Sequence, residues 1–371
     1  MSILLLILGL VLFVCLVLVH EFGHFIMARR GNVEVEEFGI GFPPRAWGKN
    51  LKSGLLLSIN WLPLGGFVKL KGENDADKSP SSFGAAPLRT KVKIMLAGVV
   101  MNLLAAFALL TLLAFVGMPR LIENQFTVAR DTHVTKQEVL IAYVEADSPA
   151  QKAGLAIQDQ LIRIGQDQNV TTANDLPALT QKQAGQTVDV VYKRDGKIRY
   201  ATVTLRSKQE VEASKKTDSP KGYLGISPTE YVVQRSTWSA PIVAVGFMKQ
   251  VTVLTFKGIG NALAGLFQGN TAKAGAQVAG PVGIFVLLKD GSLLGYQFIL
   301  MIIAVISLTL AIMNALPIPA LDGGRLFVTL LFRAAHRPLK KKTEDIIHGT
   351  GFAALMLLFV VITVVDVRRF L

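Results

Sequence analysis

The sequence predicts a polytopic α-helical membrane protein with four transmembrane helices, a cytoplasmic β-hairpin region and one extracytoplasmic α+β domain. Hydrophobic residues make up 51% of the 371 residues. Charged residues make up 18%, below the roughly 25% usual in soluble domains. The apolar residues are concentrated in a few long runs, and the segments between these runs are much more polar.

Four apolar runs are long enough, or nearly so, to cross about 30 Å of hydrocarbon. We expect transmembrane helices over residues 1–28, 93–117, 297–324 and 348–367. The first run is predicted to be an uncleaved helix, because no basic segment precedes it and no small-residue cleavage site follows it. A fifth apolar segment, 238–267, contains two lysines. We expect it to lie along the outer surface, within a region of linker and surface helices over 208–296.

Lysine and arginine are concentrated in two connections, residues 29–92 and 325–347. The positive-inside rule therefore predicts that both are cytoplasmic, and that the termini and the segment after the second helix lie outside. These connections account for much of the net charge of +13. No zinc-finger spacing or basic–aromatic motif is present, so we expect no nucleic acid partner.

Residues 121–207 have the pattern of a small α+β domain. Residues 187–205 alternate about Asp195-Gly196, as the strands of a β-hairpin do. The segment from Ser148 to Val170, SPAQKAGLAIQDQLIRIGQDQNV, resembles the PDZ domains of bacterial proteases. We therefore expect one PDZ domain, with a peptide or protein as its ligand. The segment YLGI at 223–226 resembles a PDZ carboxylate-binding loop, and a simple closing strand explains it equally well.

The first cytoplasmic connection also contains strand-like residues. Two apolar runs within Gly54 to Leu70 flank Pro63-Leu64-Gly65-Gly66, a sequence typical of a hairpin turn. This hairpin is either a small cytoplasmic element or a strand that dips toward an active site.

The most informative motif is His20-Glu-Phe-Gly-His24 in the first apolar run. The two histidines are four residues apart and share one face of a helix, so both can bind one Zn²⁺. Glu21 can then act as the general base that removes a proton from water. A glutamate in hydrocarbon costs several kcal/mol without a partner or a wet cavity, which favours a functional role over a chance pattern.

A catalytic zinc has three protein ligands and one open position. The remaining histidines lie in or beside predicted surface segments: His133, His336 and His348. Asp322 is the best third ligand, because it follows the third helix on the cytoplasmic side, at the depth of the histidine pair. If residues 238–267 crossed the bilayer, Asp322 would lie at the opposite face. The metal site therefore favours four spans.

The sequence before Asp322 is also unusual for a transmembrane helix. Pro317 and Pro319 should end the helix there, and irregular backbone at membrane depth is tolerated where it lines a cavity. Asn314 would either bond the freed backbone groups or hold a substrate strand, and we favour substrate binding slightly.

Together these motifs resemble the site-2 protease family of intramembrane zinc metalloproteases, most closely its bacterial regulator-of-sigma-E protease type. The resemblance covers nearly the whole chain. Further matching segments are Gly65 to Lys69, Ala97-Gly98, Asn102, Gly280 to Ile284 and Asn314 to Gly324. Val99 replaces the proline of the family's Ala-Gly-Pro, and a single PDZ domain replaces the tandem pair of the best-known members.

The resemblance implies that His20, His24 and Asp322 bind Zn²⁺ and that Glu21 is the general base. It implies hydrolysis of peptide bonds within or near transmembrane segments of pre-trimmed membrane proteins, namely anti-sigma factors and remnant signal peptides. It also implies a bacterial inner membrane location, in contact with membrane lipids, with the active site toward the cytoplasm.

Two further roles follow as hypotheses. The strand that contains Phe67 and Val68 would bind the extended substrate by β-addition. The PDZ domain would exclude substrates with bulky untrimmed ectodomains. The main alternative is a catalytically inactive, membrane-anchored PDZ scaffold with a structural metal site, but no fourth protein ligand is evident. A metal transporter is disfavoured, because no chain of polar residues crosses the other spans.

Overall fold

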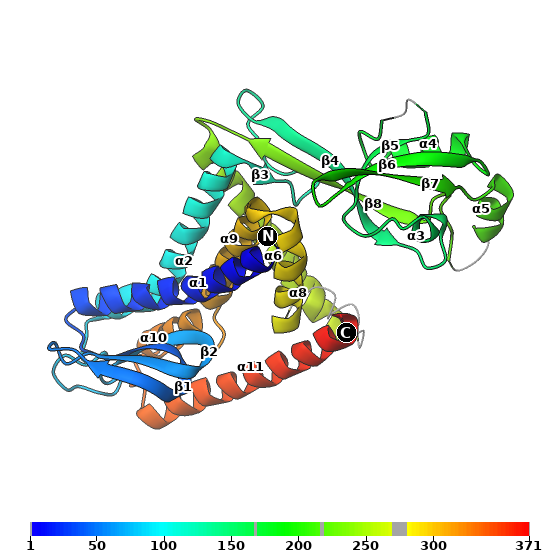
Figure 1. The fold of residues 1–371 in the computed structure, drawn as a ribbon. Coiled ribbons are helices and arrows are strands. Elements are labelled where there is room, and N and C mark those ends of the chain that lie inside the picture. The colour runs from blue at the N-terminus through cyan, green and yellow to red at the C-terminus, as the bar shows by residue number, and fades with distance from the viewer. Residues whose placement is uncertain (1, 167–168, 216–218, 269–279, 371) are drawn as a thin grey trace. The chain divides into compact units, whose positions relative to one another are not determined.

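A computed structural model describes residues 2–166, 169–215, 219–268 and 280–370 (Figure 1). The chain divides into two compact units. Unit 1 consists of Met1–Phe115, Phe126–Val128 and Trp238–Leu371, and unit 2 consists of Val116–Gln125 and Ala129–Thr237.

Unit 1 is mainly helical. Its described helices are α1 (Ser2–Arg30), α2 (Leu88–Val116), α6 (Ala240–Phe267), α8 (Pro281–Leu294), α9 (Tyr296–Ala315), α10 (Asp322–Ala334) and α11 (Lys341–Phe370). Among the described residues, five helices are long and apolar enough to cross a membrane: α1, α2, α6, α9 and α11. The chain therefore has the architecture of a multi-pass membrane protein.

Helix α1 packs against α2 and α9, and the contacts give the direction of each helix. Gly31, which directly follows α1, lies against Thr90, and Gly23 lies against Ala97, so α2 runs antiparallel to α1. Gly9 lies against Ile299, and Asp322 after the end of α9 lies against His20, so α9 runs parallel to α1.

Helix α11 is tied to the rest of unit 1 near both of its ends. Near its start, the buried Glu344 carboxylate accepts a hydrogen bond from the Asp75 backbone N–H at 2.9 Å. Near its end, the buried Asp366 carboxylate accepts a 2.7 Å hydrogen bond from the Gly283 N–H and so caps the first turn of α8.

Strands β1 (Val35–Asn50) and β2 (Leu56–Leu70) form a small sheet in which both strands bend. Residues 37–40 of β1 pair with residues 66–69 of β2 on one side and with residues 56–59 on the other. Residues 45–50 pair with residues 56–60 from the far side. Residues 66–70 therefore form one outer edge of the sheet.

This pairing corrects the predicted hairpin. The two apolar runs that flank Pro63 to Gly66 do not pair with each other, because residues 37–40 lie between them. Gly39 makes this possible, since the Phe67 ring occupies the space where a Cβ would stand. Val35 and Phe38 pack in the same buried cluster as Val68, a long-range contact that a local turn pattern cannot indicate.

The predicted cytoplasmic loop 325–347 also needs correction, because most of it is helical. Helix α10 covers Asp322–Ala334, and α11 begins at Lys341, well before residue 348. Gly324 and Val328 are buried one turn apart, where α10 packs against the rest of unit 1. The many basic residues of this segment obscured that periodicity.

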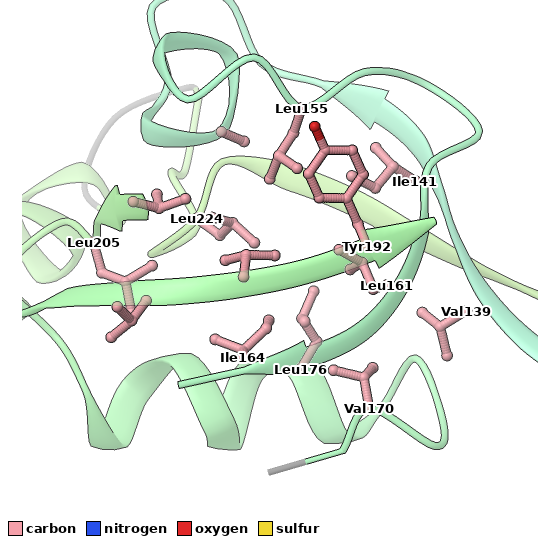
Figure 2. Packing of buried hydrophobic residues seen from close by; sticks show 14 residues of the cluster. Val139, Ile141, Leu155, Leu161, Ile164, Val170, Leu176, Tyr192, Leu205 and Leu224 are labelled. Atoms are coloured by element: carbon pink, nitrogen blue, oxygen red, sulfur yellow. The ribbon is translucent and has the colours of Figure 1, made fainter. Parts of the chain in front are cut away.

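Unit 2 is built on one antiparallel sheet in the order β3-β8-β4-β5-β6-β7. The strands are β3 (Met118–Pro119), β4 (His133–Val144), β5 (Gln160–Ile164), β6 (Thr187–Arg194), β7 (Lys197–Thr204) and β8 (Ile226–Arg235). Short helices complete the unit: α3 (Pro149–Lys152), α4 (Asp175–Lys182) and α5 (Lys208–Ser214). Figure 2 shows its core, in which Leu161 and Ile164 of β5 lie among Leu176, Leu205 and Leu224.

The hairpin predicted about Asp195-Gly196 is confirmed, since Arg194 pairs with Lys197 and both turn residues have positive φ. The domain is longer than predicted. Strand β8 lies within the sheet, between β3 and β4, so the folded unit continues past residue 207 to Thr237. This part of the predicted 208–296 linker is therefore part of unit 2, while residues 269–279 lie outside the described residues.

Candidate metal centre

Helix α1 and the start of α10 bring two imidazoles and one carboxylate together. The Asp322 Oδ2 atom lies 3.0 Å from His20 Nε2 and 3.2 Å from His24 Nε2. The two Nε2 atoms are 3.2 Å apart. Ligands about 2 Å from a tetrahedral zinc lie roughly 3.3 Å from each other, so this spacing fits one shared ion.

The surroundings of these atoms also fit a metal. Asp322 Oδ2 is buried, and it has no hydrogen-bond partner among the described residues. Such an atom is costly to bury unless a cation or donor faces it. These three residues also form the one group of three or more potential ligands within the described chain whose donor atoms all lie within 4.8 Å of one another.

The second nitrogen of each imidazole has a partner on α2. His24 Nδ1 lies 2.8 Å from the Ile94 carbonyl oxygen, so an Nδ1–H donates there and leaves Nε2 free to bind a metal. His20 Nδ1 lies 3.3 Å from Asn102 Nδ2, while Asn102 Oδ1 is buried and unpaired. Rotating the Asn102 amide by half a turn exchanges its oxygen and nitrogen. Oδ1 then accepts a hydrogen bond from the His20 Nδ1–H, so the oxygen is no longer unpaired and Nδ2 no longer faces the imidazole.

Helices α1 and α2 approach closely because glycine lies at the contact. A Cβ on Gly23 would stand 2.6 Å from the Ala97 carbonyl oxygen, and a Cβ on Gly98 would stand 2.5 Å from the Nε2 atoms of both histidines. Larger residues at either position would push the helices apart or displace the imidazoles. Small residues are the usual means of close helix packing in membranes.

The carboxylate is positioned by the break between α9 and α10. Helix α9 ends at Ala315, two residues before Pro317, and α10 begins at Asp322, so the break expected at the prolines is present. Cβ atoms on Gly323 and Gly324 would collide with the Ala315 and Ile318 carbonyl oxygens. The glycines therefore allow α10 to start directly beside the end of α9.

His348 of α11 also supports this break. The Ala320 backbone N–H donates to His348 Nδ1 at 3.2 Å, and Gly351 lies against Pro319. The sequence suggested a surface role for His348. Its contact with Ala320 depends on the fold and gives no local sequence signal.

A cavity of about 1100 Å³ adjoins the metal centre. Glu21 and His20 lie on its wall, together with residues of α8, α9, α11 and β2. Most of the lining is apolar, and Leu288, Phe359 and Ile362 are typical of it. The Glu21 carboxylate also lies beside the backbone N–H of Val68, at the outer edge of the sheet. A predominantly apolar cavity with a few polar groups at one end is typical of a binding site.

The structure brings together four of the predicted site residues: His20, Glu21, His24 and Asp322. Asn314 lines the same cavity. The side chains of Phe67 and Val68 instead pack within the sheet region, and Gly65 and Gly66 line the cavity beside them.

Sequence reasoning did not assign the role of Asn102 or the cavity wall formed by α8 and α11. A lone amide in an apolar helix is the signal that could have drawn attention to Asn102.

The fold and this site define a class of protein, a multi-pass membrane protein with a metallopeptidase-like centre among its helices. A model of peptidase family M50 matches residues 8–358. The chain therefore belongs to peptidase family M50, the site-2 protease family, and is a zinc metalloprotease of this type.

Curated relatives cover the same length. A Clostridium acetobutylicum protein named as a zinc metalloprotease is 32% identical, over 95% of this chain and 94% of its own. The protease eep of Enterococcus faecalis is 26% identical, over 97% and 98% of the two chains. The zinc metalloprotease RasP of Oceanobacillus iheyensis is 25% identical, over 96% and 97%. Zn²⁺ is accordingly the metal of this family.

The tight contact at Gly98 generates a prediction. Gly98→Ala should lower zinc affinity by at least about tenfold, because the new methyl group meets both Nε2 atoms. Zinc per chain is measured by mass spectrometry after dialysis against a graded chelator. Gly260→Ala is the matched control, since a Cβ there meets nothing within 4 Å. Equal zinc retention by the two variants would show that Gly98 does not position the imidazoles.

Proposed function

We propose that this protein hydrolyses peptide bonds within or near transmembrane segments of membrane proteins whose ectodomains have been trimmed, such as anti-sigma factors and remnant signal peptides. The observation that carries the proposal is the position of Glu21. This carboxylate lies next to three metal donors and on the wall of a mainly apolar cavity. That arrangement combines a hydrolytic centre with a binding site for an apolar segment.

The proposed roles follow from the geometry. His20, His24 and Asp322 would hold Zn²⁺, which supplies Lewis acidity that acidifies water and polarises a carbonyl group. Glu21 would accept a proton from water and return it to the leaving amine. Asn102 and the Ile94 carbonyl would keep the imidazoles oriented.

The sheet supports a binding mode for the substrate. Residues 66–70 form an outer edge, and the Val68 N–H on that edge lies beside Glu21. An extended substrate that pairs with this edge would bring its peptide bonds to the base. In this proposal the backbone of residues 66–68 binds the substrate, and Asn314, which lines the same cavity, also contacts it.

Helix directions support four crossings, with α6 at the outer surface. Helix α2 returns to the side on which α1 begins, and α9 starts on that same side. The chain between them must therefore cross an even number of times. Between α6 and α9 the described residues form one helix, α8, whose 14 residues, about 21 Å, are too few to span roughly 30 Å of hydrocarbon and reverse a crossing by α6.

This topology, combined with the positive-inside rule, gives the proposed location. The protein would lie in a bacterial inner membrane, with both termini and unit 2 outside and the metal centre toward the cytoplasm. Unit 2 would be a PDZ domain that admits trimmed substrates or binds a peptide ligand. The order of its strands and helices, together with the motif from Ser148 to Val170, supports the PDZ assignment.

The inactive-scaffold alternative predicts that a protein group closes the coordination sphere. Among the described residues, no fourth His, Cys, Asp or Glu joins the donor group. His20 lines the cavity. Both observations favour an open position, as a catalytic zinc site has.

Glu21→Gln separates the enzyme from the scaffold. The variant should keep zinc, because Glu21 is not among the donors, and should lose at least about 10²-fold in cleavage rate, because the base is gone. The measurements are zinc content and cleavage of a purified transmembrane peptide in detergent. Asp322→Ala serves as a comparison and should lose both zinc and cleavage. Wild-type cleavage by the Gln variant would reject the assigned role of Glu21.

Val68→Pro tests pairing between the substrate and the outer edge of the sheet. The proline removes one N–H on that edge, so cleavage efficiency should fall about tenfold, mainly through KM, with zinc unchanged. Val68→Ala keeps the N–H and should cleave nearly as the wild type does. The pairing model fails if the proline and alanine variants have the same KM.

Removing unit 2 tests its proposed role as a filter. Thr132 Oγ1 and Ser236 Oγ are 2.8 Å apart, so a short glycine linker can join the two chain ends that remain when residues 133–235 are removed. The shortened protein should cleave a substrate with its full ectodomain nearly as fast as the trimmed form. Cleavage of both forms is followed in proteoliposomes. Continued discrimination between them would exclude unit 2 as the filter.

A further inference from the structure

Helix α10 has an apolar face that nothing in the described chain covers. Phe327, Leu330 and Leu331 are 50%, 41% and 51% exposed. Their spacing of three and four residues places them on one side of the helix. Val328 and Thr329, which are turned away from this stripe, are buried against the rest of unit 1. The helix therefore presents an apolar stripe outward, where a soluble surface helix would present polar residues.

Basic residues follow this stripe directly. The exposed cations at the end of α10 and before the main part of α11 are Arg333, Arg337, Lys340, Lys341 and Lys342. None of them forms a salt bridge with a carboxylate in the described part of the chain. Two acidic residues lie nearby. The Glu344 side chain is buried and bonded to the Asp75 N–H, and Asp345 is exposed. The segment therefore keeps an excess of positive charge.

We propose that α10 lies in the headgroup region of the bilayer and that these basic residues bind anionic phospholipid headgroups. The helix connects α9 and α11, both of which can cross the membrane, so it is confined to a membrane surface. Helices that bind lipid at a membrane surface typically combine an apolar stripe with adjacent Lys and Arg residues.

The apolar stripe is what favours lipid over other acidic partners. A nucleic acid would neutralise the five cations but would leave Phe327, Leu330 and Leu331 in water. A bilayer surface accepts both features at once, with the apolar side chains among acyl chains and the cations among phosphates. This inference concerns a surface away from the cavity and does not depend on proteolysis.

The test uses the full-length chain in nanodiscs. Cys15 is the only cysteine, so Cys15→Ser with Leu331→Cys gives one labelling site on the stripe, to which a bimane fluorophore is attached. Phosphatidylcholine discs carry a small fraction of lipid with a nitroxide on the acyl chain. In one series this lipid is phosphatidylglycerol, and in the other it is phosphatidylcholine. The nitroxide phosphatidylglycerol should quench the label at about fivefold lower mole fraction.

Neutralising the cations should remove this preference. In the variant Arg333→Gln/Arg337→Gln/Lys341→Gln, the two nitroxide lipids should quench equally, because the apolar stripe still reaches the acyl chains. The control removes the same charge elsewhere, from exposed residues of unit 2, as Lys152→Gln/Lys197→Gln/Arg199→Gln. It should keep the fivefold preference. Raising the salt concentration should reduce the preference in the parent protein.

Three results would overturn the proposal. Equal quenching by both lipids in the parent would show contact without anion binding. An unchanged preference in the neutralised variant would assign the selectivity to other residues. Quenching by neither lipid would place the stripe away from the bilayer. In that case, a label that becomes shielded from water when an RNA oligonucleotide is added would identify nucleic acid as the occupant. Shielding in discs that hold two chains would identify a second copy of the protein.

Discussion

The structure of unit 1 is constrained by one requirement, that two imidazoles and a carboxylate from distant parts of the chain meet within about 3.2 Å among apolar helices. Polar groups in such surroundings need partners. The partners come from α2, through the Ile94 carbonyl and Asn102, so α2 must lie in contact with α1. Glycine at positions 23 and 98 makes that contact possible. The same contact between α1 and α2 therefore determines both the close packing of the helices and the geometry of the ligands.

The same constraint explains the irregular elements around the site. A continuous helix through residues 316–321 would carry Asp322 onward along the axis of α9, away from the histidines. The break turns the chain, and two glycines let α10 begin against the end of α9. The sheet supplies what helices cannot, an outer edge of backbone groups beside Glu21. Helices have no unpaired N–H along their length to offer an extended peptide.

The sequence predicted those parts of this arrangement that depend on residues close to one another in the chain. The spacing of His20 and His24 and the prolines before Asp322 act within one or two helical turns, so the donor set could be inferred. The position of residues 37–40 between two segments of β2, and the contact of His348 with Ala320, depend on long-range packing. Helix α10 was missed for another reason, because its many cations resembled a loop although Gly324 and Val328 keep a helical period.

Helix α10 links the bilayer to the metal centre. Its first residue is Asp322, and its first turn contains Arg325, whose guanidinium lies over the Phe83 ring and 3.5 Å from the Glu73 carboxylate. Glu73 in turn accepts a hydrogen bond from the Leu70 N–H at the end of the proposed substrate strand. The position of α10 therefore affects both the position of the metal donor Asp322 and the position of the outer edge of the sheet. If anionic lipid holds the outer face of α10, the lipid surface also fixes the distance between substrate strand and metal. A soluble protease would have to fix that distance by packing alone.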